Sequence, residues 1–398
     1  MKMIGFLLIC AEFAAASPIY TVASLGGLVA GPSTGYAINS SGTVAGSAQN
    51  ASGNQQAFVS TPSGLQGLPS GSSTSYAYGI NNSGTVVGTT YSNGQAYGTI
   101  WSGSSTTQLG AGSYAIAINN SGEVAGGNGE AFVARNGQVQ DLTTQPGFDW
   151  SAAYGINDAG TVVGDGQLTN GTFQAIVWSP DGGISLLGTF GGPNSQATGI
   201  NDNGEVVGFA SLPSGYENAF SVVDAVMTDL GTLGESSFAY GVNNNGEVVG
   251  YSYLADGDQH AFLYNDGTML DLNSLIPSNS GWDLLAAYGI NDVGQITGVG
   301  LYDGQLTAFL LTDPAGITPT PEPSEMLVLV MALAGMALLH GRGPVRALGS
   351  EAATGSRGGR ACPWRRNSRS TDHIGLAASW EEAGAGTIPH TAEITDRP

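Results

Sequence analysis

The sequence predicts an all-β fold, a seven-bladed β-propeller of four-stranded blades closed by an N-terminal strand. One strand–turn–strand phrase, typified by "AYGINNSGTVVG" at residues 77–88, recurs seven times along the chain. The asparagines that begin its turns lie 38 to 48 residues apart, and a period near 42 suits four strands and their connections. The composition of 63 glycines with only 10% charged residues suits many short strands and turns.

Each period contains four strand-like segments in a fixed order. Strand a reads "AYGIN" at 153–157, and strand b reads "GEVVG" at 246–250. Strand c reads "QAIVW" at 174–178, and strand d is a short run such as "DLG" at 229–231. Helical repeats would need a helical pattern, and the rungs of a β-helix are much shorter than this period. The repeat is therefore interpreted as one propeller blade.

The number of strands predicts how the ring closes. Strands a, b and c each occur seven times, but strand d follows only six of the c strands, because "AFLLTD" at 308–313 leads directly into Pro314. A seventh d-like segment, "IYTVASLGG" at 19–27, precedes the first repeat. Pairing it with the last blade would remove the open sheet edge.

The turn of the repeated phrase has a chemical explanation. Its asparagine can accept a hydrogen bond from the backbone two residues on, and its glycine can adopt a positive φ. Acidic and amide oxygens in "NDNG" at 201–204 would also suit calcium, but several of the turns carry no carboxylate, so we expect a structural role and no metal. The predicted turn residues are Asn39, Asn81, Asn119, Asn157, Asn201, Asn243 and Asn291 with Gly42, Gly84, Gly122, Gly160, Gly204, Gly246 and Gly294.

Strand c supplies the predicted core. An alanine and a large side chain follow each other in every c strand, and burial of each large side chain should contribute roughly 1.5–3 kcal/mol. These large residues are Phe58, Tyr97, Phe132, Ile176, Phe220, Phe262 and Phe309.

The charge of the repeat region excludes some partners. Residues 18–320 hold 22 acidic side chains and a single basic one, Arg135. Such a surface repels nucleic acid and anionic lipid, so we expect no nucleic-acid partner. Eight of the ten basic residues lie between Arg342 and Arg397, in a stretch of different composition.

The N-terminus predicts export. Residues 1–17 combine Lys2, an apolar run over 3–10 and an alanine-rich cleavage region at 14–16, as in a signal peptide. The repeats contain no cysteine, so no disulfide framework is expected there.

Residues 18–313 resemble the HAF repeat family of extracellular repeat proteins. The resemblance rests on "HAF" at 260–262, "GINDNG" at 199–204 and the long match over 271–300. It implies an extracellular localisation and supplies no catalytic residues.

The segment after the repeats resembles a PEP-CTERM sorting signal. A Pro-rich linker over 314–324 contains the Pro-Glu-Pro sequence, and 325–342 contains an apolar run that ends in basic residues. The resemblance implies a Gram-negative bacterium, an exosortase-type partner, and final location at the cell surface or outside the cell. The 14 residues of 326–339 would span about 21 Å as a helix, short for a ~30 Å hydrocarbon core, which favours transient anchoring in the inner membrane. Unlike the family pattern, the chain continues through 343–398, a basic low-complexity tail expected to be disordered.

The function is predicted from where the repeats differ. The b–c and d–a connections vary in length and emerge on one face of a propeller, and variable loops on a rigid scaffold are the usual place for binding. We therefore expect an exported, non-catalytic protein without a cofactor that binds carbohydrate or another exported protein. The candidate ligand-binding residues are Trp150, Trp282, Asp256, Asp258 and Glu217.

Other interpretations remain open from the sequence. The two tryptophans could instead fill gaps between blades. The protein could be a structural scaffold of an extracellular matrix, as in a biofilm. It could also be a polysaccharide-degrading enzyme, since His260 lies near Asp256 and Asp258 and other carboxylates, Asp149 and Asp283, are placed on the same face. However, His260 occupies the repeat position of Gln56, which favours a structural variant.

Overall fold

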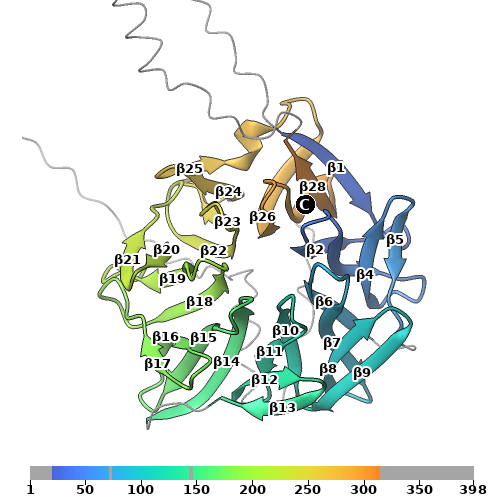
Figure 1. The fold of residues 1–398 in the computed structure, drawn as a ribbon. Coiled ribbons are helices and arrows are strands. Elements are labelled where there is room, and N and C mark those ends of the chain that lie inside the picture. Colours follow the sequence, from blue (N-terminus) through green and yellow to red (C-terminus); the bar gives the residue numbers. More distant parts are fainter. Residues whose placement is uncertain (1–19, 71–73, 143–146, 314–398) are drawn as a thin grey trace, which may run out of the picture. The chain divides into compact units, whose positions relative to one another are not determined.

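The structure, a computed structural model, describes residues 20–70, 74–142 and 147–313. These residues form seven four-stranded antiparallel sheets arranged around a common axis (Figure 1). The predicted sorting segment and the tail beyond 313, like the signal peptide, lie outside the described residues. None of the helices in the described ranges is long and apolar enough to span a membrane.

The four strand positions of the blades match the predicted order. Strand a is β2 (Ser33–Ile38), β6 (Ser75–Ile80), β10 (Tyr114–Ile118), β14 (Phe148–Ile156), β18 (Ser195–Ile200), β22 (Ser237–Val242) and β26 (Trp282–Ile290). Strand b is β3 (Val44–Gln49), β7 (Val86–Ser92), β11 (Val124–Gly127), β15 (Val162–Leu168), β19 (Val206–Ser211), β23 (Val248–Tyr253) and β27 (Ile296–Tyr302).

The outer two positions are shorter or more exposed. Strand c is β4 (Gln55–Thr61), β8 (Gln95–Ser102), β12 (Ala131–Arg135), β16 (Phe173–Trp178), β20 (Glu217–Val223), β24 (Gln259–Asn265) and β28 (Gln305–Thr312). Strand d is β5 (Gly64–Gly67), β9 (Ser105–Ala111), β13 (Gln138–Asp141), β17 (Ile184–Leu186), β21 (Val226–Asp229), β25 (Thr268–Asp271) and β1 (Thr21–Gly26). A single 3-10 turn, η1 (Leu272–Leu275), follows β25.

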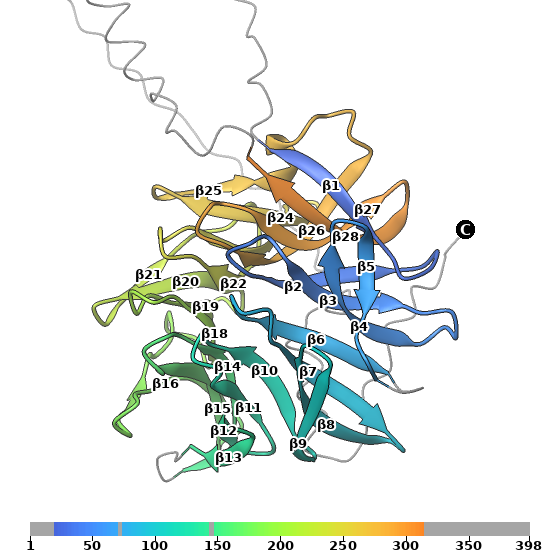
Figure 2. The same ribbon diagram turned by 45° about the vertical axis from the view of Figure 1, so that its right-hand side comes forward.

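The predicted closure is confirmed. Strand β1 pairs antiparallel with β28, from Thr21 opposite Thr312 to Gly26 opposite Ala308, and completes the sheet of β26, β27 and β28. Figures 1 and 2 both show β1 beside β28 at the seam of the ring. The last blade thus contains residues from both ends of the repeat region, and its sheet edge is paired in the same way as in the other six.

The predicted asparagine turn is also confirmed. In the first blade, Asn39 Oδ1 accepts hydrogen bonds from the backbone N–H groups of Ser41 (3.1 Å) and Thr43 (3.0 Å). Gly42 has φ +79°, and the six equivalent glycines lie between +75° and +85°. This left-handed backbone conformation is the one that glycine adopts without a steric cost.

The asparagine side chains have a second role that the sequence did not predict. Each Nδ2 donates to the backbone carbonyl of the equivalent asparagine in the next blade, at 2.8–3.2 Å. All seven side chains are buried. The seven bonds form a closed ring around the axis, at the end of the propeller where the a–b turns lie.

A second set of polar contacts joins the blades at the other end of strand a. The hydroxyl of the serine that opens or just precedes strand a accepts the backbone N–H of strand c in the preceding blade, as in the 2.9 Å bond from Ala57 N to Ser75 Oγ. The same contact occurs at Ser33, Ser113, Ser151, Ser195 and Ser237. At six of the seven junctions, a blade is therefore hydrogen-bonded to its neighbour near both ends of its inner strand.

The core prediction is confirmed in six blades and wrong in one. The side chains of Phe58, Phe132, Ile176, Phe220, Phe262 and Phe309 are fully buried. In the second blade, Thr99 pairs with Gly88 and occupies this position, whereas Tyr97 lies two residues earlier and is half-buried. The seventh blade has an equally short turn at Asp303–Gly304 and keeps Phe309 at the core position, so the difference lies in the residues: "QAYGT" at 95–99 places Gly98 and Thr99 where the other blades have an alanine and a large side chain.

Candidate ligand-binding face

The b–c turns and d–a connections lie at the same end of the blades, because strands a to d alternate in direction. We call this end the loop face. Its b–c turns differ: the fifth and sixth blades have five-residue connections at 212–216 and 254–258, whereas the second and seventh have two-residue turns. The opposite end carries the uniform asparagine turns.

The two candidate tryptophans lie in strands, not in d–a loops as expected from the sequence. Trp150 is in β14 and Trp282 begins β26, because both strands extend three residues further than the other a strands. The Trp282 ring stacks on Tyr302 with centroids 4.8 Å apart and meets Phe309 edge-on at 6.2 Å. Trp150 meets Phe173 edge-on at 6.4 Å. Both side chains are half-buried, and these ring contacts lie within the blade of each tryptophan.

Two exposed aromatic side chains were missed. Tyr216 and Tyr302 are 49% and 37% exposed, the only exposed aromatics among the described residues, and both lie at b–c turns of the loop face. The sequence does contain a signal for Tyr216, because this residue falls within a length-variable b–c segment, where binding residues are expected.

The acidic candidates lie in and beside these turns. Asp256 and Asp258 are exposed in the turn between β23 and β24, where Asp256 Oδ1 accepts the N–H of Asp258 at 3.3 Å. Glu217 begins β20, and its N–H donates to Ser236 Oγ at 3.1 Å. The structure therefore brings the acidic groups of the fifth and sixth blades to the same face as the two tyrosines.

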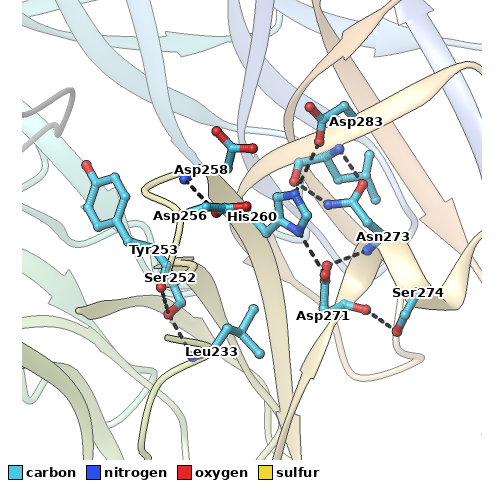
Figure 3. Close-up of polar contacts among 11 residues, drawn as sticks. Leu233, Ser252, Tyr253, Asp256, Asp258, His260, Asp271, Asn273, Ser274 and Asp283 are labelled. Carbon is cyan, nitrogen blue, oxygen red and sulfur yellow. Dashed lines mark hydrogen bonds and ion pairs between the residues drawn. The ribbon is translucent and has the colours of Figure 1, made fainter. Parts of the chain in front are cut away.

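His260 lies between two carboxylates (Figure 3). Its Nδ1 is 2.7 Å from Asp271 Oδ2, and its Nε2 is 3.8 Å from Asp283 Oδ1. Asp271 also accepts the N–H of Asn273 at the start of η1. The Ser274 hydroxyl donates to the Asp271 carbonyl and does not face the imidazole. Within the described ranges, His260 is thus paired with carboxylates and not with a nucleophile.

The blades themselves identify the role of this pair. In the fifth blade, Asn218 Nδ2 donates to Asp229 at 2.9 Å, between the same two strand positions as His260 and Asp271. A contact that recurs with a different donor belongs to the scaffold, since it ties strand c to strand d. The contact between His260 and Asp283 has no such counterpart in the fifth blade, so this repeat does not explain it.

The described residues contain no group of three or more histidine, cysteine, aspartate or glutamate side chains arranged to hold a metal ion. The charge is uneven around the ring: no charged side chain occurs between residues 20 and 122, so all the carboxylates lie in the third to seventh blades. The acidic part of the loop face is therefore confined to one side of the propeller.

Comparisons with known proteins add little to this geometry. A family described as "Protein of unknown function (DUF3466)" matches residues 191–309, which covers most of the last three blades. No curated protein matches the chain.

Forty-six chains of solved structures match. A puromycin-hydrolyzing peptidase from Mycobacterium tuberculosis is 11% identical, with 68% of this chain and 50% of that chain covered and a TM-score of 0.48. The propeller domain of the Trilobed protease from Pyrococcus furiosus is 9% identical (70% and 94% covered, TM-score 0.48). The BP39L lectin from Burkholderia pseudomallei is 9% identical (73% and 98%, TM-score 0.38). The chain spans about half the length of the peptidase, and these distant likenesses assign no activity.

Proposed function

We propose that this propeller is an exported, cell-surface or matrix-associated binding protein that takes a carbohydrate on its loop face and catalyses no reaction. The observation that carries the proposal is the position of Tyr216 and Tyr302. Both are exposed, both lie at b–c turns, and the acidic turn with Asp256 and Asp258 lies in the blade between them.

This arrangement suits the chemistry of a sugar. The C–H face of a pyranose packs on an aromatic ring, while its hydroxyls donate to carboxylates at the edge of the ring. Tyr302 stacks on Trp282 and remains 37% exposed, so Trp282 would support the residue on which a sugar packs. Asp256, Asp258 and Glu217 supply acceptors on the same face.

The scaffold supports a binding role. The ring of seven asparagine bonds and the serine contacts hold the inner strands of neighbouring blades in one arrangement. Loops that project from a rigid frame lose less conformational entropy when they bind. The proposal that no reaction is catalysed rests on His260, whose contact with Asp271 repeats the Asn218–Asp229 contact of the neighbouring blade.

The proposed export and sorting rest on sequence alone. The signal-like residues 1–17, the resemblance to HAF repeats and the PEP-CTERM-like segment over 318–342 support an exported protein that an exosortase-type enzyme processes. Mass spectrometry of the C-terminus of the native protein tests processing: a chain that ends near residue 398 on the cell surface would contradict it.

A glycan array tests the binding proposal. We expect the purified protein to bind a subset of saccharides, and Tyr216→Ala or Tyr302→Ala to weaken that binding at least tenfold. Val293→Ala is a matched control, because Val293 is 64% exposed in an a–b turn on the opposite face. An array without signal would contradict the proposal, as would binding that survives both tyrosine variants; capture of a defined exported protein instead would favour the protein-binding alternative.

A further inference from the structure

The axis of the propeller carries a wall of aromatic side chains. Every strand a has a register shift at the same position of the repeat, where a β-bulge leaves a residue outside the ladder, and β14 and β26 each have a second shift nearer their start. Five of these seven bulge residues are tyrosines, and the full set is Tyr36, Tyr78, Ile116, Tyr154, Thr198, Tyr240 and Tyr288. Strand a is the innermost strand of each blade (Figure 1).

These side chains border an axial channel. The bulge tyrosines lie on the innermost strands, surrounded by all seven blades, yet each retains partial exposure to solvent. On the side of the asparagine turns, the next residues of strand a are apolar, as in Ile38 and Ile80, and the buried asparagine ring follows. On the side of the loop face, strand a begins, and its first side chains differ from blade to blade.

The aromatic side chains form a continuous arc around most of this channel. Successive ring centroids from Tyr78 through Tyr36, Tyr288 and Tyr240 to Tyr251 lie 5.3–5.8 Å apart. Toward the loop face the arc extends at both ends. In the second blade Tyr76 and Tyr91 are 6.3 Å apart, and the sixth-blade rings of Phe238, Tyr251 and Tyr253 are 4.8–6.4 Å apart. The arc thus involves the sixth, seventh, first and second blades.

The fourth blade and the inner strand of the fifth interrupt the arc with polar groups. Asp165 lies on β15 opposite Ala152 and is only 2% exposed. Gln196 Nε2 donates to its Oδ2 at 2.8 Å, and Tyr154 also hydrogen-bonds to this carboxyl. Gln196 is partly exposed, whereas the hydroxyl oxygen of Tyr154 is buried. No other blade has a carboxyl at this position of strand b.

This contact fixes the direction of the amide. Because Gln196 Nε2 donates to a carboxyl, its Oε1 is left as an acceptor for another group. The Tyr154 hydroxyl is buried against the same carboxyl and is not accessible to a ligand. A buried carboxyl that orients a partly exposed amide is typical of a binding site whose supporting contacts are preorganised.

We propose that the loop-face half of the axial channel binds one sugar unit of a saccharide, held by Gln196 on the polar sector and by the aromatic arc opposite. A pyranose has an apolar C–H face and a rim of hydroxyls, and the channel offers an aromatic wall and a polar side chain. A purely apolar ligand would displace the water at Gln196 without replacing its hydrogen bonds. The inference rests on the proposed function only in taking saccharides as the ligand class.

Titration calorimetry with the purified full chain tests this site. The probes are glucose, galactose, N-acetylglucosamine and the disaccharides cellobiose, lactose and chitobiose. We expect one of them to bind with a stoichiometry of one, and Gln196→Met and Tyr253→Leu each to weaken that binding at least tenfold. Tyr253 is suited to the test because it lies at the loop-face end of the arc and its ring points away from the His260 cluster (Figure 3).

Matched controls come from the outer strands. Gln56 is a half-buried glutamine whose Nε2 donates to the Leu68 carbonyl, and Tyr264 is a half-buried tyrosine of β24. Gln56→Met and Tyr264→Leu should bind the probe within twofold of the wild type. If Gln196→Met does not fold, as judged by thermal melting, Tyr253→Leu alone decides the test. Absence of binding by all six probes, or unchanged binding in the folded axial variants, would overturn the inference.

The outcome also separates this site from the loop face. Binding of the small saccharides that depends on Tyr253, with a silent polysaccharide array, would leave the axial site standing and contradict the proposed loop-face function. Array binding that depends on Tyr216 and Tyr302, with no effect of the axial variants, would support the loop-face function and contradict the axial site.

Discussion

Asn291 Nδ2 donates to the backbone carbonyl of Asn39 at 3.0 Å, although 252 residues separate the two in the sequence. This bond closes the ring of seven asparagine contacts at the same seam where β1 pairs with β28. Closure therefore has two independent parts, one at the inner strands and one at the outer sheet edge.

The ring predicts that aspartate cannot replace its asparagines. In Asn157→Asp the carboxylate would still accept the Thr161 N–H, but it would lose the 3.1 Å bond to the Asn201 carbonyl and place a negative oxygen beside it. We expect a loss of about 1–3 kcal/mol in the free energy of unfolding, measured by chemical denaturation. Asn170→Asp is the control, because Asn170 is exposed and acts only as an acceptor for Thr172. Equal stability of both variants would contradict a structural ring.

The sequence predicted the blade number, the closing strand and the turn geometry, because these follow from local patterns repeated seven times. It did not predict the asparagine ring or the serine contacts, since both join neighbouring blades through backbone carbonyls and N–H groups that no residue pattern displays. The glycine of "VVG" is likewise required by a contact that the sequence does not show. A Cβ on Gly88 would collide with the Tyr76 carbonyl, which belongs to the neighbouring strand of the same blade.

The candidate site was less predictable than the fold for a physical reason. Aromatic side chains are equally suited to packing and to ligand stacking, and their exposure depends on contacts between strands. Trp282 is covered by Tyr302, and this pairing across β26 and β27 follows from a register that the sequence letters do not show. The Asp165–Gln196 contact joins two blades and was likewise not visible.

A strained turn predicts a stabilising substitution. Ala225 has φ +63° in the turn between β20 and β21, where the equivalent turn of the next blade has Gly267 at φ +78°. A left-handed conformation costs a non-glycine residue about 1–2 kcal/mol, partly offset by the greater flexibility of glycine in the unfolded chain. We expect Ala225→Gly to raise the free energy of unfolding by about 0.5–1 kcal/mol. The reciprocal Gly267→Ala should lower it, and a shift of both variants in the same direction would contradict the strain argument.

Asp165 predicts a pH dependence of stability. Burial raises the pKa of its carboxyl to about 7, against 3.8 for an exposed aspartate, while hydrogen bonds from Gln196 and Tyr154 act in the opposite direction. Between pH 4 and pH 7 the unfolded chain has released this proton and the folded chain retains it, so stability falls as the pH rises through this window. The maximum effect is on the order of 4 kcal/mol, at about 1.4 kcal/mol per pKa unit.

Asp165→Asn isolates this contribution. Asparagine keeps an acceptor for Gln196 and cannot ionise, so we expect the variant to be more stable than the wild type at pH 8 and similar at pH 4. The measurement is the free energy of unfolding of both proteins across this pH range. A wild-type curve parallel to that of the variant would contradict a raised pKa at Asp165.

His260 provides a test of the scaffold interpretation. Because Asn218 makes the equivalent contact with Asp229, we expect His260→Asn to retain the contact with Asp271 and to change the free energy of unfolding by less than about 1 kcal/mol. Saccharide binding on the loop face should be unchanged. His260→Leu, which removes the donor, should cost more. Loss of a polysaccharide-degrading activity in His260→Asn would instead favour the enzyme alternative.

Truncation of the strand c core residue should destabilise the protein less in the second blade than in the fifth. Phe220 is fully buried in the fifth blade, and its truncation to alanine should cost about 3–5 kcal/mol. The equivalent Thr99 is also fully buried, but its hydroxyl bonds Thr90 Oγ1 at 2.9 Å, and Gln108 bonds the same Thr90 oxygen at 3.1 Å. Thr99→Ala removes few atoms and two hydrogen bonds, to Thr90 Oγ1 and to the Tyr97 carbonyl, so we expect a cost of about 1–2 kcal/mol. Because each blade packs on two neighbours, both losses should appear in a single unfolding transition. A cost for Thr99→Ala equal to that for Phe220→Ala would show that the polar contacts of the second blade stabilise it as strongly as a buried aromatic ring.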